Sequence, residues 1–356
     1  PIQAHSTDFM AGIEFQSNYA PNWTTFTSQA MQNVAALHAN WIVLTPSWSF
    51  TRTQPLIFAA QPGEDPLWDD TKLMLQQANA LNLNTALFPT PSFPTDSDSW
   101  WISAPRDFGW WNEWFDRYRQ FALHHADIAS ANNAQVLILG GEWLAPAMQN
   151  GMLVDGQASG VPADAELRWN TILNDVRSRF SGEIWWALPY TPGSLVSAPA
   201  FIKGVDGIYL LWDAPLSTTA PTTKEAMTAE AIRLLDEEIS PYQVSIEKEI
   251  IIGLAVPSAT GAENACVSNA IGGCLDWTAL SRPLADIPSV GLNLQAQVDI
   301  YESMLNAING RSWINGFISR GYYPPVMLRD KSASIYGKPA ADLLWYWYPR
   351  LLGLSQ

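Results

Sequence analysis

Short apolar segments alternate with longer amphipathic segments along almost the whole chain. Apolar or β-branched runs predict eight strands, at residues 12–18, 40–48, 84–92, 135–143, 183–190, 207–215, 249–258 and 312–321. Amphipathic stretches predict helices at 27–39, 68–82, 110–132, 163–180, 224–240, 292–309 and 338–351, and only a short helical segment, 198–203, follows the fifth strand. Repeated strand–helix units are typical of parallel α/β folds, and eight units predict a closed (β/α)8 TIM barrel.

Local signals at the helix ends support this division. Asp164 is predicted to cap the helix that starts near Ala165, and Lys338-Pro339 places a proline in the first turn of the last helix, where its missing N–H is tolerated. No linker or repeat divides the chain, so we expect one domain over residues 1–356. The alternative, a doubly wound open sheet, normally has a glycine-rich turn after its first strand, and residues 17–25 read SNYAPNWTT instead.

Composition excludes several classes of partner. The chain of 356 residues has 34 acidic and 19 basic residues, a formal net charge of −15, and no basic cluster that would favour nucleic acid or an anionic membrane. The chain contains no run of about 18 apolar residues, so the sequence predicts no membrane span. The sequence starts at Pro1, without Met or a signal segment, which is typical of a processed or trimmed chain, and we expect a secreted, cell-surface or periplasmic protein.

The two cysteines also favour export. Cys266 and Cys274 lie in the segment CVSNAIGGC, whose two glycines allow the chain to turn back, and we expect a disulfide between them; two free thiols are the alternative. The histidines show no metal-ligand spacing, and the sequence implies no metal and no cofactor; they are His5, His38, His124 and His125.

Aromatic and polar residues gather where the predicted strands end. In a barrel of this class the carboxyl ends of the strands form the site. Aromatic rings stack on sugar rings, and charged or amide groups bind sugar hydroxyls. We therefore predict carbohydrate binding by Glu14, Asn18, Trp48, Arg52, Trp143, Tyr190, Trp212, Arg320 and Tyr322. The alternative for many of the 18 tryptophans is packing of helices against the barrel, especially for Trp185, Trp186, Trp345 and Trp347.

Glu142 is the first candidate for catalysis. The apolar segment VLILGG leads directly to this carboxylate at the predicted end of the fourth strand. We expect burial beside Trp143 to raise its pKa, so that it can protonate a departing glycosidic oxygen. The alternative is a structural ion pair with an arginine such as Arg52 or Arg320.

These features resemble the clan A glycoside hydrolases, and nearest the β-mannanase family 113. The resemblance rests on the Gly141-Glu142 strand end, the eighth strand that runs into aromatic residues, and the closing GKPAADLLWYWY. It implies a (β/α)8 barrel in which Glu142 is the acid/base, and it maps the lysine-proline helix start onto Lys338-Pro339. Two positions depart from the clan's pattern: Gly141 replaces an asparagine, and the seventh strand ends in residues 254–258, LAVPS, without the nucleophilic glutamate.

A second carboxylate is needed for glycoside hydrolysis. We rank Asp213 first, as a nucleophile or as the base for a water, because it ends the sixth strand in LLWDAP. Glu263 follows, on the loop that the disulfide would stiffen, and Glu14 is third.

The sequence thus predicts a glycosidase that cleaves a β-linked polysaccharide or oligosaccharide, mannan-like by resemblance. A non-catalytic carbohydrate-binding barrel that has lost its nucleophile is the alternative. A lyase or aldolase would need a strand-end lysine or carboxylates gathered on a metal, which the strand ends lack.

Overall fold

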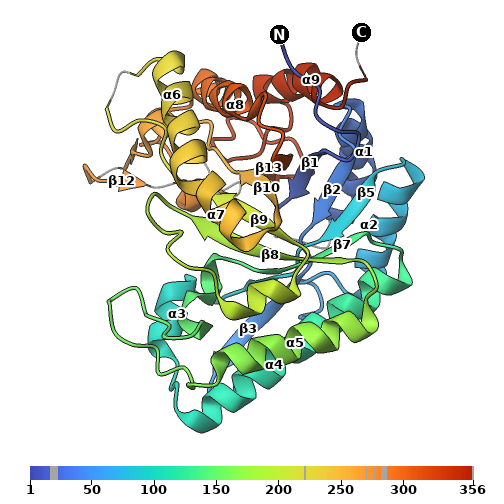
Figure 1. Cartoon of the computed structure of the whole chain (residues 1–356), viewed down its shortest axis with the longest axis vertical. Helices are drawn as coiled ribbons and strands as arrows, with labels where there is room; N and C mark the ends of the chain where they lie inside the picture. Colours follow the sequence, from blue (N-terminus) through green and yellow to red (C-terminus); the bar gives the residue numbers. More distant parts are fainter. Residues whose placement is uncertain (17–22, 220–221, 270, 276, 282–286, 355–356) are drawn as a thin grey trace.

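Eight parallel strands close into a barrel in the computed structural model, which describes residues 1–16, 23–219, 222–269, 271–275, 277–281 and 287–354. Their order around the barrel is β1-β13-β10-β9-β8-β7-β5-β2 (Figure 1). The strands are β1 (Met10–Phe15), β2 (Trp41–Leu44), β5 (Asn84–Leu87), β7 (Val136–Gly140), β8 (Glu183–Tyr190), β9 (Gly207–Trp212), β10 (Glu249–Leu254) and β13 (Ile314–Tyr322). This order confirms the predicted (β/α)8 TIM barrel, and each strand lies within two residues of its predicted start.

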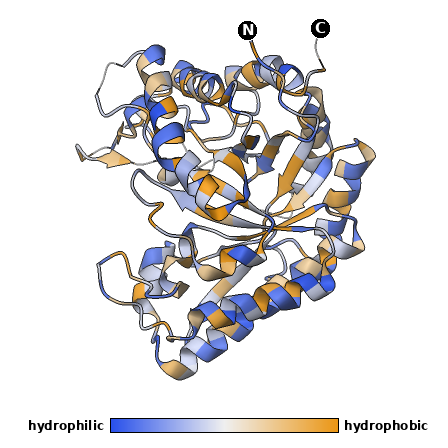
Figure 2. Ribbon diagram, viewed as in Figure 1, coloured by the Kyte–Doolittle hydropathy of each residue, from blue (hydrophilic) through white to orange (hydrophobic). Residues whose placement is uncertain are grey.

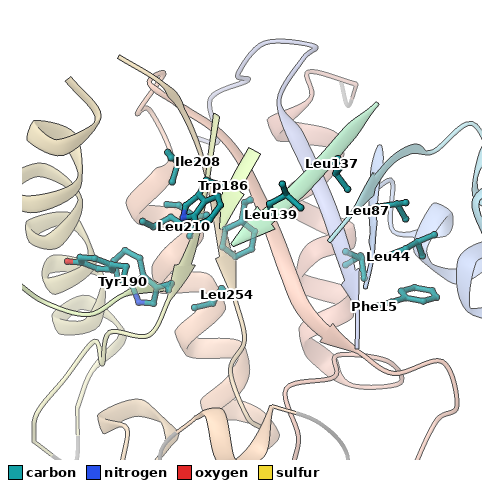
Figure 3. Close-up of a cluster of buried hydrophobic side chains, with 14 of the residues drawn as sticks. Phe15, Leu44, Leu87, Leu137, Leu139, Trp186, Tyr190, Ile208, Leu210 and Leu254 are labelled. Carbon is teal, nitrogen blue, oxygen red and sulfur yellow. The ribbon is translucent and has the colours of Figure 1, made fainter. Parts of the chain in front are cut away.

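Alternate residues of each strand enter two different apolar layers. In β7, Val136 and Ile138 pack inside the barrel, whereas Leu137 and Leu139 pack against the surrounding helices. Figure 3 shows the outer layer, with side chains such as Leu87, Leu139 and Leu210 pointing away from the barrel interior. Because both faces of a parallel sheet are buried, hydrophobic residues recur along the barrel strands (Figure 2). They are most continuous in β7 (VLILG) and β10 (EIIIGL), which is why the sequence revealed these strands.

The helices cover the outside of the barrel. They are α1 (Thr24–Ala36), α2 (Trp68–Ala80), α3 (Ser97–Ser103), α4 (Phe108–Ala131), α5 (Ala165–Arg179), α6 (Lys224–Leu234), α7 (Ser240–Ile246), α8 (Leu294–Ile308) and α9 (Pro339–Leu351). The segment after β8 forms only the short 3-10 helix η3 (Ala200–Gly204), as predicted. The predicted helix 224–240 corresponds to α6, the π-helical turn η4 (Leu235–Ile239) and the first residue of α7, which follow one another without a gap.

The two predicted helix starts differ in outcome. Pro339 occupies the first turn of α9, as expected. Asp164 is the N-cap residue of α5, but its side chain accepts no hydrogen bond from a backbone N–H of the helix and instead accepts one from Nε of Arg168 at 2.8 Å. Its carboxylate therefore stabilises the first turn through a side-chain ion pair rather than through a cap.

A small second sheet was not predicted. The barrel strand β2 ends at Leu44, and after Pro46, which has no N–H to donate, the chain starts β3 (Ser47–Thr53). β3 pairs with β4 (Leu56–Ala59) and β6 (Thr90–Ser92). The predicted strand 40–48 is therefore two strands that belong to different sheets.

The predicted disulfide between Cys266 and Cys274 is present, with 4.7 Å between the Cα atoms. It joins the neighbouring strands β11 (Val267–Ser268) and β12 (Cys274–Leu275), which pair antiparallel. Among the described residues no helix is both long and apolar enough to cross a membrane.

Helix α4 buries a histidine side chain in its apolar face. His125 is 2% exposed, and its Nδ1 lies 2.8 Å from the carbonyl oxygen of Phe121. Burial lowers the pKa of His125 to about 3, and the neighbouring His124 adds to this shift. The imidazole is therefore neutral in the folded protein at pH values where the unfolded chain would protonate it.

We predict that His125 makes the protein sensitive to acid. Its contribution to stability is complete above pH 6.5 and is lost as the pH falls toward 3, because only the unfolded chain then gains the proton. The advantage in unfolding free energy over His125→Gln should shrink by about 1.4 kcal/mol per pH unit below pH 6. Urea titrations measure it, with the exposed His38→Asn as control; a difference that is constant with pH would contradict the prediction.

Candidate active site

A cleft of about 360 Å³ opens at the carboxyl ends of the barrel strands. Its wall combines four carboxylates with one arginine and several aromatic rings. The lining residues include Glu14, Phe88, Phe93, Asp96, Glu142, Trp143, Trp212, Asp213, Ala255, Trp277, Thr278, Ser281 and Arg320. The cleft lies at the strand ends, where the sequence predicts a site.

Two consecutive glycines deliver Glu142 into this cleft. Gly140 ends β7 with φ 101°, and Gly141 follows with φ 123°, conformations that residues with a side chain rarely adopt. A Cβ on Gly140 would lie 2.6 Å from the carbonyl oxygen of Ala187, so β8 also leaves no room. The Gly141 N–H donates to that same oxygen at 3.0 Å. The backbone path thus explains why glycine, rather than asparagine, precedes Glu142 here.

A hydrogen bond from α3 holds the backbone of Trp143 in place. The indole N–H of Trp101, on α3, donates to the carbonyl oxygen of Trp143 at 2.8 Å. The Trp143 ring packs against Phe93, Trp114 and Tyr118 and is partly exposed. The Trp101 bond fixes the backbone next to Glu142, and the partly exposed ring of Trp143 forms part of the cleft wall.

The predicted burial of Glu142 is wrong. Its side chain is 51% exposed, and its Oε1 accepts a hydrogen bond from Nη1 of Arg320 at 3.4 Å. Glu142 begins the 3-10 helix η2 (Glu142–Ala147), which turns its side chain into the open cleft rather than under Trp143. The ion pair with Arg320 that the sequence offered as the alternative is present, within the site itself.

Glu14 is the buried carboxylate of the cleft. It is 5% exposed; its Oε2 accepts from the Tyr209 hydroxyl at 2.5 Å, and both its oxygens accept from Nε of Arg320, at 3.2 and 3.1 Å. Burial raises the pKa of Glu14, whereas Arg320 and Tyr209 oppose the shift by stabilising the charged form. Burial also opposes the charge of Arg320, yet Glu14 and Glu142 raise the pKa of its guanidinium group. Arg320 therefore stays charged between the two carboxylates.

The remaining candidate carboxylates are separated by the fold. Asp213 follows β9, lines the cleft, and its backbone N–H donates to the carbonyl oxygen of Tyr190 at 2.9 Å. Glu263 lies in the 3-10 helix η5 (Ala262–Asn264) and is not among the lining residues. The structure thus places Glu142, Asp213 and Glu14 in one cleft and Glu263 outside its lining.

Several predicted sugar-binding residues lie elsewhere. Trp48 packs under β4 and α4, and Arg52 is exposed on the second sheet, because the chain leaves the barrel after Leu44. Tyr190 is fully buried and its hydroxyl donates to Glu238, while Tyr322 is 1% exposed and stacked on Phe15. These four positions are corrections, since none of them lines the cleft.

Trp212 and Asn18 differ in their relation to the cleft. Trp212 lines the cleft but is only 2% exposed, with its indole N–H bonded to the carbonyl oxygen of Ala214 at 2.9 Å. At this exposure Trp212 offers almost no free ring surface to a sugar. Asn18 lies outside the residues that the structure describes.

Sequence reasoning missed the wall that follows the disulfide loop. Trp277, Thr278 and Ser281 line the cleft, and the Trp277 indole donates to the carbonyl oxygen of Ala262 at 2.8 Å. A tryptophan three residues after Cys274 was the available signal, but its direction depends on this tertiary hydrogen bond. Across the described residues, no group of three or more His, Cys, Asp or Glu side chains is arranged to hold a metal ion.

The chain resembles known glycoside hydrolases in its sequence profile and in its fold. The sequence profile of Glycoside Hydrolase Family 113 matches residues 15–191, from the end of β1 to just after β8. A solved GH113 β-mannanase from Alicyclobacillus acidocaldarius is 18% identical with a TM-score of 0.69, and the match covers 96% of this chain and 98% of that one. A GH113 β-1,4-mannanase is 17% identical, with a TM-score of 0.70 and the same coverage.

More distant barrels share only the architecture. A β-glucosidase from Thermotoga maritima is 9% identical with a TM-score of 0.55, and the match covers 100% of both chains. No curated protein sequence matches this chain significantly. The profile match confirms the resemblance to family 113, and the structural likeness shows the common barrel fold.

We predict that Trp143 contributes a stacking surface for sugar. Trp143→Ala should weaken binding of oligosaccharide about tenfold, since a lost aromatic contact costs about 1–1.5 kcal/mol. Calorimetry with mannan, glucan, xylan and galactan fragments measures the change. Trp345→Ala, at a half-exposed position of α9 outside the cleft, is the control. Equal affinity of the Trp143 variant and the wild type, for a fragment that binds, would contradict the prediction.

Proposed function

We propose that this chain, a relative of glycoside hydrolase family 113, hydrolyses glycosidic bonds in a β-linked polysaccharide or oligosaccharide, with a mannan-like glycan as substrate. The family match and the names of the two mannanase neighbours support the substrate class. The cleft supports it chemically, because carboxylates and aromatic rings face the same space. Its disulfide is consistent with the oxidising conditions of a secreted, cell-surface or periplasmic protein.

The observation that carries the proposal is the position of Glu142. Its carboxylate stands half exposed at the end of β7, inside the cleft and within reach of a bound substrate. In the proposed reaction Glu142 donates a proton to the departing glycosidic oxygen as the bond breaks. Trp143 would stack on the neighbouring sugar ring.

Asp213 is proposed as the second carboxylate. It lines the same cleft from the end of β9, two strands from β7 around the barrel. It would attack the anomeric carbon directly or accept a proton from the attacking water. Glu14 is poorly suited to attack, because it is buried and both of its oxygens accept hydrogen bonds from Arg320 or Tyr209.

One observation favours a second candidate function, carbohydrate binding without hydrolysis. Ala255 follows β10 in the cleft wall. The resemblance to clan A enzymes implies a nucleophilic glutamate at this strand end. A binding protein would retain the aromatic wall and need no second carboxylate.

We predict that Glu142→Gln lowers the hydrolysis of a β-1,4-linked mannan oligosaccharide about 10²–10⁴-fold, because glutamine cannot donate the proton. An activated aryl glycoside should lose less, since its leaving group needs no protonation. Assays of reducing ends and of aryl release measure the two rates. Wild-type protein that binds the oligosaccharides yet releases no reducing ends between pH 4 and 8 would favour the binding protein instead.

Asp213→Asn should abolish cleavage of both substrates, whereas Glu263→Gln should retain most of the activity. The two variants remove one carboxylate each, the first inside the cleft and the second outside its lining. Kinetics on the aryl glycoside measure both, and the anomeric form of the first product, followed by NMR, separates direct attack from water attack. Full activity of the Asp213 variant would remove this residue from the mechanism.

A further inference from the structure

We propose that Glu14 is a positioning residue for Glu142. It holds Arg320 in the place from which the guanidinium group binds the Glu142 carboxylate. Its negative charge also offsets the positive charge of Arg320, so that Glu142 can take up a proton. This inference rests on the proposed role of Glu142 as the general acid. It assigns a function to a buried charge that the chemistry itself does not use.

A series of hydrogen bonds runs from the barrel interior to the open cleft. Tyr209 donates to Glu14 at 2.5 Å, Nε of Arg320 donates to Glu14 at 3.1 Å, and Nη1 of Arg320 donates to Glu142 at 3.4 Å. Exposure increases along this series, from 7% for the Glu14 side chain through 16% for Arg320 to 51% for Glu142. Arg320 is thus anchored at its buried end and presents its outer nitrogen to the cleft.

The backbone next to these hydrogen-bonded residues leaves room for their side chains. A Cβ on Gly253, in β10, would lie 2.7 Å from the Tyr209 ring and 2.8 Å from Cδ of Arg320. The pairing of β1 with β13 also shifts register between Ile13 and Phe15, which places Glu14 at an irregular position of the strand. Such irregularities redirect side chains near active sites. A glycine and a strand irregularity therefore make room for the same ion pair.

The charge balance gives Glu14 its effect on Glu142. A positive charge within about 4–6 Å of a carboxylate stabilises its ionised form and lowers its pKa by about 1–3 units. A general acid must instead be protonated when the substrate arrives. With Glu14 present, the charge of Arg320 is divided between two carboxylates, and Glu14 also repels a negative charge on Glu142.

The other charged or titratable groups around these residues come from three further elements. Asp213 at the end of β9 and Asp96 before α3 line the same cleft, and both would repel negative charge on Glu142. Tyr301 of α8 lies near Arg320 and Glu14, and burial raises its pKa, so it remains neutral. Arg320 is the single cation among the described residues that line the cleft.

The test is the titration of Glu142 in the free protein, followed by NMR of ¹³Cδ-labelled glutamate and assigned with Glu142→Gln. In Glu14→Gln the amide oxygen can still accept a hydrogen bond from Arg320 and hold it, but the negative charge is gone. The full charge of Arg320 then acts on Glu142, so the titration midpoint should move about one pH unit lower. In Arg320→Gln it should move higher, and Glu14→Asp, which keeps the charge, should stay near the wild type. Glu302→Gln, which removes an acid paired with Lys224 on the outer helices, is the control.

The pH profile of kcat/KM is the second measurement. Its alkaline limb should shift with the NMR midpoint, to lower pH in Glu14→Gln and to higher pH in Arg320→Gln. An unchanged Glu142 midpoint in folded Glu14→Gln, or equal shifts in the same direction for both variants, would overturn the inference. If Glu14→Gln does not fold, an unchanged Glu142 midpoint in Arg320→Gln would overturn the inference, because Arg320 would then have no effect on the titration of Glu142. NMR shifts as expected in a protein without hydrolase activity would instead refute only the proposed function.

Discussion

The ion pair between Glu14 and Arg320 joins the two strands at which the barrel closes. Glu14 belongs to β1 and Arg320 to β13, and the two residues are 306 positions apart in the chain. Removing two charges from water costs more than a typical surface pair returns, so a buried pair is weak support for stability alone. Besides its two hydrogen bonds to Glu14, Arg320 donates one to Glu142 in the cleft. We therefore connect the buried ion pair with the site rather than with the stability of the fold.

The backbone around β7 imposes a second constraint on the site. Gly140 and Gly141 adopt φ values that other residues rarely reach, and the carbonyl oxygen of Ala187 leaves no space for a Cβ at Gly140. This path brings Glu142 into the cleft, while the Trp101 indole fixes the following residue. An asparagine at 141, as the clan's pattern would have it, would be strained here.

The far wall of the cleft depends on contacts that follow β10. Buried Lys338 donates to the Ser258 hydroxyl at 2.9 Å and pairs with Asp330 at 3.0 Å, which ties the segment after β10 to the segment after β13. The disulfide closes a loop next to Trp277, whose indole binds the carbonyl oxygen of Ala262. Loops from the last two barrel strands therefore shape the same side of the site that the first strand supplies with Glu14.

The sequence by itself determined the eight strands, the helices around them, the disulfide and the arrival of Glu142 at a strand end. Those features depend on near neighbours in the chain, such as the apolar run before Gly140 or the glycines between the cysteines. Tertiary structure alone decided which aromatic rings face the cleft, and it buried Tyr190 and Tyr322 although their positions in the sequence resemble that of Trp143. It also exposed Glu142 and paired it with Arg320, because burial and charge balance depend on side chains that different strands bring together around the barrel, and no spacing within one strand encodes them.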